Sequence, residues 1–247
     1  MDTASGDSGQ LMEFLGEVFD WFATADNWTG TQGVLHRTWE HVQLSVISVA
    51  VAAGLALVPG VILGHLGRGG VFAVAVVNIG RAVPSFGILA LALPVSIKLG
   101  LGLGFWPTLI ALVALALPPM FTNSYTGVRQ VDPAMTEAAT GMGMKGSQVL
   151  WNIELPAASP LILTAIRISS VQVVATATLG ALVAWGGLGR FIIDGFAQGD
   201  RVMVFAGGLL VALLAVLTEL SFSLFERFAI PKGIRLAGRS AASATAT

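Results

Sequence analysis

The feature that most constrains this chain is a series of five long apolar stretches that contain almost no charge. They run from about residue 42 to 64, 71 to 95, 107 to 128, 157 to 185 and 203 to 225. A helix that crosses the ~30 Å hydrocarbon core of a bilayer needs about 20 apolar residues, so each stretch is long enough. Only 11% of the 247 residues are charged, whereas a soluble domain carries roughly a quarter. The sequence therefore predicts an all-α integral membrane protein with five transmembrane helices embedded in the lipid bilayer, and it argues against a soluble enzyme.

The remaining composition predicts no catalytic, cofactor or metal site on this chain. The formal net charge of −1 provides no basic surface for nucleic acid, and the lack of cysteine removes thiolate chemistry. Lys145 and Ser147 follow two glycines, but in the wrong order and spacing for a phosphate-binding loop. The histidines lie in loops or at span ends without carboxylates at ligand spacing, and we expect them at the surface: His36, His41 and His65.

The distribution of basic residues predicts the orientation of the chain, because cytoplasmic loops of membrane proteins are enriched in lysine and arginine. One side carries seven such residues: Arg68, Arg129, Lys145, Arg227, Lys232, Arg235 and Arg239. The other side carries four: Arg37, Lys98, Arg190 and Arg201. We therefore expect the N-terminus outside a bacterial plasma membrane and the 65–70 loop, the 129–156 loop and the C-terminus in the cytoplasm.

The two ends of the chain differ from the apolar middle. Residues 1–41 lack the basic start and the uninterrupted apolar run of a signal peptide. A helix over Leu11–Phe22 would place Glu13, Glu17 and Asp20 on one face and apolar side chains on the others, which is typical of a helix lying in the outer membrane interface. The alternative is an appendage that only packs against the protein. Residues 229–247 form a cytoplasmic tail, and its Ser/Ala/Thr-rich end predicts disorder.

The stretch from residue 129 to 156 is polar and interrupts the apolar pattern. Asp132 followed by Pro133 is typical of a helix start. Gly141 and Gly143 are expected to break this helix. Ser147 is expected to cap a second short helix, which Pro156, at the end of this stretch, is expected to terminate. Two short helices around a glycine turn, with small residues and methionines exposed, form either a docking surface for a cytoplasmic partner or a simple surface loop.

Three ionisable residues lie within the predicted spans: Arg81, Arg167 and Glu219. A charge at this depth costs several kcal/mol unless it is paired or hydrated, so these residues need a partner or water. One interpretation is an arginine–glutamate pair that fixes helix packing. The other is an arginine that faces an aqueous translocation path. Gly60 and Gly64 form a G-x-x-x-G pattern that permits close helix approach, although chance is a rival in a chain with 30 glycines.

The polar stretch resembles a known motif. The sequence Glu137-Ala138-Ala139, three residues, Gly143, nine residues, Ile153, one residue and Leu155-Pro156 matches the EAA loop of binding-protein-dependent ABC importer permeases in every defined position. Residues 39–45 (WEHVQLS), 78–86 (NIGRAVPSF), 176–179 (TATL) and 186–189 (GGLG) are similar to the osmoprotectant branch of that family. The resemblance extends over residues 36–230.

The resemblance implies a methionine-importer-like permease fold and no enzymatic activity on this chain. In the family, two permeases form the pore, an ATPase dimer binds ATP and Mg beneath them, and an extracytoplasmic solute-binding protein delivers the cargo. The EAA loop is the coupling element, in which Glu137 would contact the ATPase and Gly143 would allow a sharp turn. The motif positions assigned to ATPase coupling are Glu137, Ala138, Ala139, Gly143, Ile153, Leu155 and Pro156. The implied cargo is a quaternary-ammonium osmoprotectant: glycine betaine, choline, carnitine or proline betaine.

Several alternatives stay open at this stage. The same machine could carry methionine or another amino acid, because specificity resides largely in the binding protein. A secondary transporter or channel is a rival from another class, but such proteins often show internal repeats with paired broken helices, and we find none. An assembly or sensor subunit that binds a partner without transport is a third. The pore could be a homodimer or a pair of related permeases.

Overall fold

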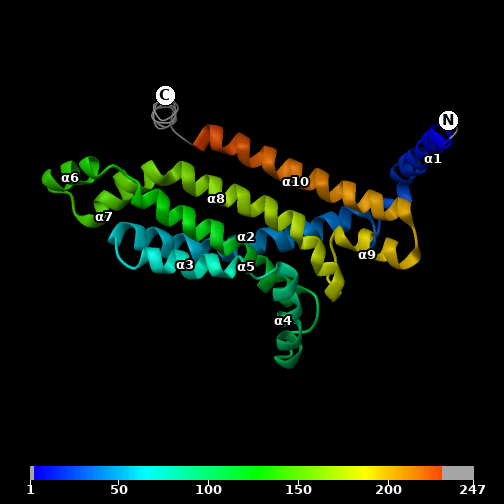
Figure 1. The fold of residues 1–247 in the computed structure, drawn as a ribbon, viewed down its shortest axis with the longest axis horizontal. Helices are drawn as coiled ribbons and strands as arrows, with labels where there is room; N and C mark the ends of the chain where they lie inside the picture. The colour runs from blue at the N-terminus through cyan, green and yellow to red at the C-terminus, as the bar shows by residue number, and fades with distance from the viewer. Residues whose placement is uncertain (1–2, 230–247) are drawn as a thin grey trace. The chain divides into compact units, whose positions relative to one another are not determined.

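The computed structural model describes residues 3–229, and within them the chain is helical and contains no strand. The helices, labelled in Figure 1, are α1 (Thr3–Ala23), α2 (Val34–Leu66), α3 (Gly70–Gly80), α4 (Ser85–Lys98), α5 (Phe105–Arg129), α6 (Pro133–Gly141), α7 (Gly146–Val149), α8 (Leu155–Thr176), α9 (Gly189–Gln198) and α10 (Arg201–Ala229). Short 3-10 turns cover Ala25–Asn27 and Ala177–Val183, and a π-helical turn covers Leu150–Glu154. The predicted all-α class is confirmed. The predicted tail, residues 229–247, lies almost wholly outside the described residues.

Four helical stretches are long and apolar enough to cross a membrane: α2, α5, α10 and the continuous stretch Gly146–Val183 that contains α8. A fifth is obtained when α3 and α4 are counted as one span that is broken at residues 81–84. The break has a local cause, because Pro84 lacks an N–H group and disfavours the helical conformation of Val83. Four to five spans agree with the predicted apolar stretches.

The fourth stretch differs from the expectation of one span from residue 157 to 185. The α-helix ends at Thr176, and the chain continues as a 3-10 turn to Val183. Ala184 follows with φ of 66°, a left-handed conformation that is uncommon for a residue with a Cβ. The end of this stretch is therefore a 3-10 turn closed by a left-handed residue, and not a regular α-helix.

The described chain divides into two compact units. The first contains residues 3–48, 85–112 and 172–216, and the second contains residues 49–84, 113–171 and 217–229. In the first unit, four buried residues from α2, the loop before α9, α9 and α10 form a core: Val34, Leu188, Phe191 and Val211. Trp21 and Trp28 pack against this core, so the N-terminal segment is part of the unit.

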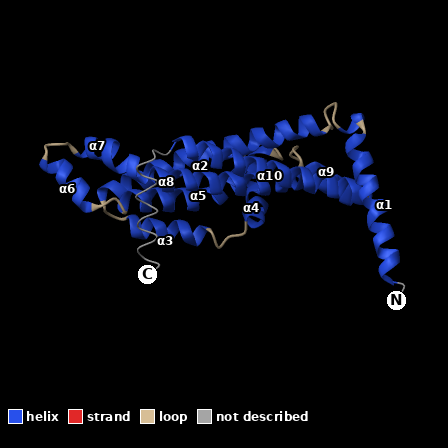
Figure 2. Ribbon diagram, turned by 90° about the horizontal axis from the view of Figure 1, so that it is seen from above, coloured by secondary structure: helices blue, strands red, loops and turns tan. Residues whose placement is uncertain are grey.

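Helix α1 is held by specific contacts in the first unit. The Phe14 and Phe205 rings meet edge to face with centroids 5.4 Å apart, and Val18 is buried. Asn27 and Trp28 donate side-chain hydrogen bonds to carbonyls in the last turn of α1, which fixes the angle at which the helix leaves. Figure 2 shows α1 running at a steep angle to α9. Next to the packed face, α1 exposes a second apolar face: Leu11, Met12, Leu15 and Phe19.

Close helix contacts through glycine organise the second unit. A Cβ on Gly60 would overlap the Ser124 hydroxyl and lie 2.9 Å from the Phe121 carbonyl oxygen. A Cβ on Gly64 would lie 2.9 Å from the Tyr125 carbonyl oxygen. Helices α2 and α5 therefore approach until their backbones nearly touch, as small-residue motifs permit. The G-x-x-x-G prediction is confirmed, with α5 as the neighbour.

This contact predicts a stability difference between two glycines of α2. Gly60→Ala should lower the free energy of unfolding by about 1–3 kcal/mol, because the added methyl group overpacks the contact with α5. Gly54→Ala is the matched control, since no atom lies within 4 Å of its Cβ position, and a gain in helix propensity should leave it at least as stable as the wild type. Thermal unfolding of both variants in lipid nanodiscs measures the difference. Equal midpoints for the two variants would show that the close approach is absent.

Candidate functional site

The EAA loop folds as a capped helix followed by a glycine turn. Asp132 accepts a hydrogen bond from the Ala134 N–H at 2.9 Å, and Pro133 occupies the first turn of α6, as predicted. Gly141 is the last residue of α6 instead of breaking it. Gly143 follows with φ of 90°, and its N–H donates to the Thr140 carbonyl at 2.9 Å. This is a glycine-dependent helix end of the Schellman type, so the turn at Gly143 requires glycine.

The second half of the loop differs from two predictions. Ser147 does not cap α7, because the helix begins at Gly146 and the extended Lys145 precedes it. The Lys145 N–H donates to the Gln148 side chain at 2.8 Å. Pro156 does not end the helix either, since α8 continues through it to Thr176. A proline inside a helix clashes with the carbonyl four residues earlier, and the wider π turn over Leu150–Glu154 directly before α8 accommodates it.

The motif positions face different surroundings. Glu137 and Ala138 are exposed, whereas Ala139 is buried. Ile153 and Leu155 are half-buried. Exposed side chains of large size surround them in the loop: Met135, Met142 and Trp151. The predicted surface of small residues and methionine is present, and Figure 1 shows α6 and α7 lying beyond the first turn of α8.

A pocket lies between the end of α2 and the loop. His65 Nδ1 lies 2.6 Å from Glu154 Oε2, and the Glu154 side chain is only 10% exposed. The adjoining cavity has a volume of about 430 Å³, and Glu137 lines it from α6 together with Thr136 and Thr140. His65 is partly exposed at 24%, and its contact with Glu154 was not predicted from the sequence. Within residues 3–229, no group of three or more histidines and acids is placed to hold a metal ion.

The intramembrane charges form a three-residue cluster in the second unit. Arg167 Nη1 lies 3.4 Å from Glu219 Oε1 and 3.3 Å from Glu226 Oε2. The Glu219 side chain is 46% exposed, whereas that of Glu226 is 15% exposed. The structure thus brings Arg167 and Glu219 together, while Arg81 is exposed in the break between α3 and α4 and has no ion pair with any carboxylate of the described residues.

Sequence analysis missed Glu226 because it lies directly after the predicted end of the last span. A signal was present, since Glu219 and Glu226 are seven residues apart. That spacing is two helical turns and places both carboxylates on one face. Continuing the helical pattern beyond residue 225, the predicted end of the span, would have identified Glu226 as a second carboxylate on the face of Glu219.

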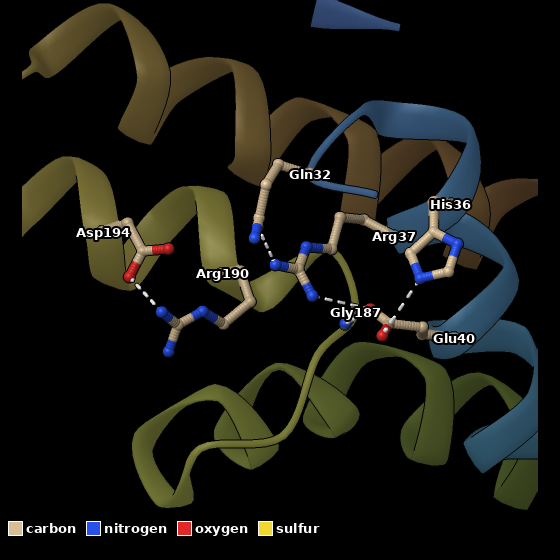
Figure 3. Close-up of polar contacts among 7 residues, drawn as sticks. All are labelled: Gln32, His36, Arg37, Glu40, Gly187, Arg190 and Asp194. Carbon is tan, nitrogen blue, oxygen red and sulfur yellow. Dashed lines mark hydrogen bonds and ion pairs between the residues drawn. The ribbon is translucent and has the colours of Figure 1, made fainter. Parts of the chain in front are cut away.

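A second polar cluster joins α2 to the loop before α9 in the first unit (Figure 3). Glu40 Oε2 accepts a hydrogen bond from the Gly187 N–H at 2.8 Å and one from Arg37 Nη1 at 2.8 Å. Arg37 also donates to Gln32, and His36 Nε2 lies 3.4 Å from Glu40 Oε1. A Cβ on Gly186 would overlap the Glu40 carboxylate. The glycine pair therefore lets the loop close around this side chain.

His41 lies beside this cluster and is 1% exposed, so its predicted surface position is wrong. Its Nε2 lies 2.8 Å from the Val174 carbonyl oxygen, which satisfies the buried ring. His41 belongs to a buried face of α2 with helical spacing: His41, Leu44, Ser45 and Ser48. Through Glu40 and His41, residues 39–45 lie against residues 186–189, two of the segments singled out in the sequence.

Residues 54–230 match the model of the binding-protein-dependent transport system inner membrane component family. The chain belongs to this family. It is therefore an integral inner-membrane permease subunit of a binding-protein-dependent transport system. The geometry of the EAA loop described above lies wholly within the matched residues.

Several similar permease proteins align with about four-fifths of the chain. The carnitine transport permease protein OpuCB of Listeria monocytogenes is 35% identical over 202 residues, which cover 82% of this chain and 90% of that protein. The choline transport system permease protein OpuBB of Bacillus subtilis is 32% identical over 82% of this chain and 91% of its own length. The osmoprotectant import permease protein OsmW of Salmonella typhimurium is 32% identical over 80% and 92%.

Among solved structures, the inward-facing MetNI methionine ABC transporter is similar with a TM-score of 0.70. The match covers 81% of this chain and 97% of that chain at 22% identity. The predicted methionine-importer-like permease fold is confirmed. At this identity the likeness concerns the fold alone.

The charge cluster predicts unequal roles for its two carboxylates. Arg167→Gln leaves Glu226 buried without a partner and should lower the free energy of unfolding by about 3–5 kcal/mol. Adding Glu226→Gln should restore part of this loss, because the two changes share one interaction. Glu219→Gln alone is the control and should cost about 0–1 kcal/mol, since that side chain is half exposed. Unfolding of detergent-solubilised protein measures the cycle, and strictly additive effects of Arg167→Gln and Glu226→Gln would contradict the pairing.

Proposed function

We propose that the chain is the membrane-spanning subunit of an ABC importer that carries quaternary-ammonium osmoprotectants into the cell: glycine betaine, choline, carnitine or proline betaine. The observation that supports this proposal is 32–35% identity, over four-fifths of the chain, to permeases named for carnitine, choline and osmoprotectant transport. The intact EAA loop supports the ABC class. ATP and Mg are bound and used by a partner ATPase, so this chain performs no hydrolysis.

In this proposal the coupling loop, residues 129–156, docks on the ATPase dimer. Glu137 and Ala138 present themselves on the exposed side of α6, and Met142 extends this surface at the turn. The helix of α7 passes through the π turn into α8 without a linker. A displacement of the loop by the ATPase is therefore transmitted directly to a membrane-crossing helix, which alternates the permease between outward- and inward-facing states.

The cluster of Arg167, Glu219 and Glu226 indicates which surface of the second unit faces water or a second permease. Arg167, Glu219 and Glu226 carry a formal net charge of −1, and the Glu219 side chain is 46% exposed in the single chain. A half-exposed carboxylate at membrane depth is strongly disfavoured in hydrocarbon. We therefore propose that a second permease, identical or related, faces this cluster across an aqueous path, where a carboxylate favours a cationic cargo. Arg81, exposed at the break between α3 and α4, is proposed to reach the same path.

The proposed orientation places the N-terminus outside and the C-terminus in the cytoplasm. The excess of lysine and arginine in the 129–156 loop and the C-terminal residues supports it. Helix α1, with one packed, one apolar and one acidic face, suits the outer interface of the bilayer.

Uptake of labelled cargo tests the proposed function. Cells that lack osmoprotectant importers and express this chain with its ATPase and binding protein should accumulate radiolabelled choline, carnitine or glycine betaine. Unlabelled betaines should compete, whereas methionine should not. If the cells import methionine and unlabelled betaines do not compete, the cargo is an amino acid and not an osmoprotectant. Uptake that persists without the ATPase would contradict the ABC class.

A substitution in the glycine turn tests the coupling loop. Gly143→Val should uncouple transport from ATP hydrolysis, because a β-branched residue is strongly disfavoured at φ of 90°. Gly141→Val is the matched control: its Cβ position is equally open, but its backbone is helical. In proteoliposomes, the Gly143 variant should lose uptake and the response of the ATPase to loaded binding protein, while the Gly141 variant should retain both. Wild-type uptake by the Gly143 variant would refute the role of the turn.

A further inference from the structure

The contact between His65 and Glu154 joins parts of the second unit that are 89 residues apart in the sequence. His65 lies in the last turn of α2, where the helix dipole favours positive charge. Glu154 is the last residue of the π turn and precedes α8. The buried carboxyl group requires a hydrogen-bond partner, because a buried polar group without one is destabilising. His65 at 2.6 Å is that partner.

The pair is placed where the loop meets the helices that support it. Glycine contacts hold the end of α2 against α5, and a Cβ on Gly64 would lie 2.9 Å from the side chain of Val128 in the last turn of α5. On the loop side, a cavity of about 430 Å³ separates His65 from the facing residues of α6, Thr136 and Thr140. Apolar packing therefore does not fill the space between α6 and α2. The contact between His65 and Glu154 lies at the edge of this cavity.

The contact between His65 and Glu154 is made at the π turn that connects α7 to α8. A π turn lacks the regular hydrogen-bond spacing of the α-helix and often occurs at functional positions. It is the point at which α7 could change its angle to α8. Glu154, inside this turn, is held by a side chain from a different helix.

We infer that His65 and Glu154 are a positioning pair that sets the angle of the coupling loop to the α2–α5 helix pair. The inference rests on the proposed function, because it assigns the pair to the transmission of loop movement. With the pair intact, a displacement of α6 and α7 moves α2, α5 and α8 together. Without it, the loop pivots at the π turn, and ATP hydrolysis proceeds without moving the membrane helices in step.

The ratio of ATP hydrolysed to cargo imported tests this inference in the complete complex, reconstituted in proteoliposomes with its ATPase and binding protein. His65→Ala and Glu154→Ala should each raise the ratio about fivefold or more, the lower range of coupling between sites. His65→Arg supplies an N–H donor that can reach Glu154 and should return the ratio toward the wild-type value. His36→Ala is the matched control on the same helix, since His36 is more exposed and lies 3.4 Å from Glu40, and it should leave the ratio unchanged.

A covalent crosslink in place of the His65–Glu154 contact distinguishes a role in positioning the loop from a role in the stability of the protein. The chain contains no cysteine, so a His65→Cys/Glu154→Cys protein, studied with cysteine-free partner subunits, carries only the two introduced thiols. Without a crosslink, this variant should have a raised ratio of ATP hydrolysed to cargo imported. A short bifunctional thiol reagent should lower that ratio toward the wild-type value. Each single-cysteine variant, treated with the same reagent, should keep its raised ratio. This comparison within one sample holds even if the alanine variants assemble poorly.

Two results overturn the inference: a wild-type ratio in both alanine variants, or a bridged double-cysteine protein that is no better coupled than the unbridged one. A wild-type complex whose ATPase does not respond to loaded binding protein would instead contradict the proposed function. The two failures are therefore distinguishable from the wild-type measurement alone.

Discussion

Inside hydrocarbon, every peptide group has to find its hydrogen bond within the protein, and every charge has to find a partner or water. This constraint explains why the chain is helical from residue 3 to 229 apart from short turns. It also gives meaning to the places where the helices are irregular. The break between α3 and α4, the 3-10 turn after α8 and the π turn before it lie in or beside predicted spans, where freed backbone groups need protein or water around them.

The same constraint accounts for how the helices are held together. Because lipid is as apolar as leucine, helices gain little from burying leucine against one another, and close backbone approach and polar contacts become important. In the second unit, Gly60 and Gly64 bring α2 against α5, and Arg167 joins α8 to two carboxylates of α10. In the first unit, Glu40 and His41 of α2 bind backbone groups of distant segments. In both units glycines allow segments of the chain to come into close contact, and polar side chains determine which segments pair.

Sequence reasoning succeeded where a local rule decides the outcome. Apolar length located the helices, Asp132 and Pro133 marked the start of α6, and the left-handed turn at Gly143 followed from glycine chemistry. It failed where distant segments decide. His41 is buried and its ring contacts the Val174 carbonyl of α8, 133 residues away in the sequence, and no feature near His65 indicates Glu154. At Pro156, the local rule that proline ends a helix was overridden by a π turn that let the helix continue.

The proposed transport mechanism depends above all on the 129–156 loop being the cytoplasmic surface on which the partner ATPase docks. A photo-crosslinking residue at Met142, whose side chain is 78% exposed at the glycine turn, tests it most directly in living cells. The account predicts a covalent adduct between this position and the ATPase subunit. No adduct is expected from Phe19 of α1, which is 73% exposed and which the proposed orientation places outside the cell. An ATPase adduct from Phe19, or its absence from Met142, would contradict the account.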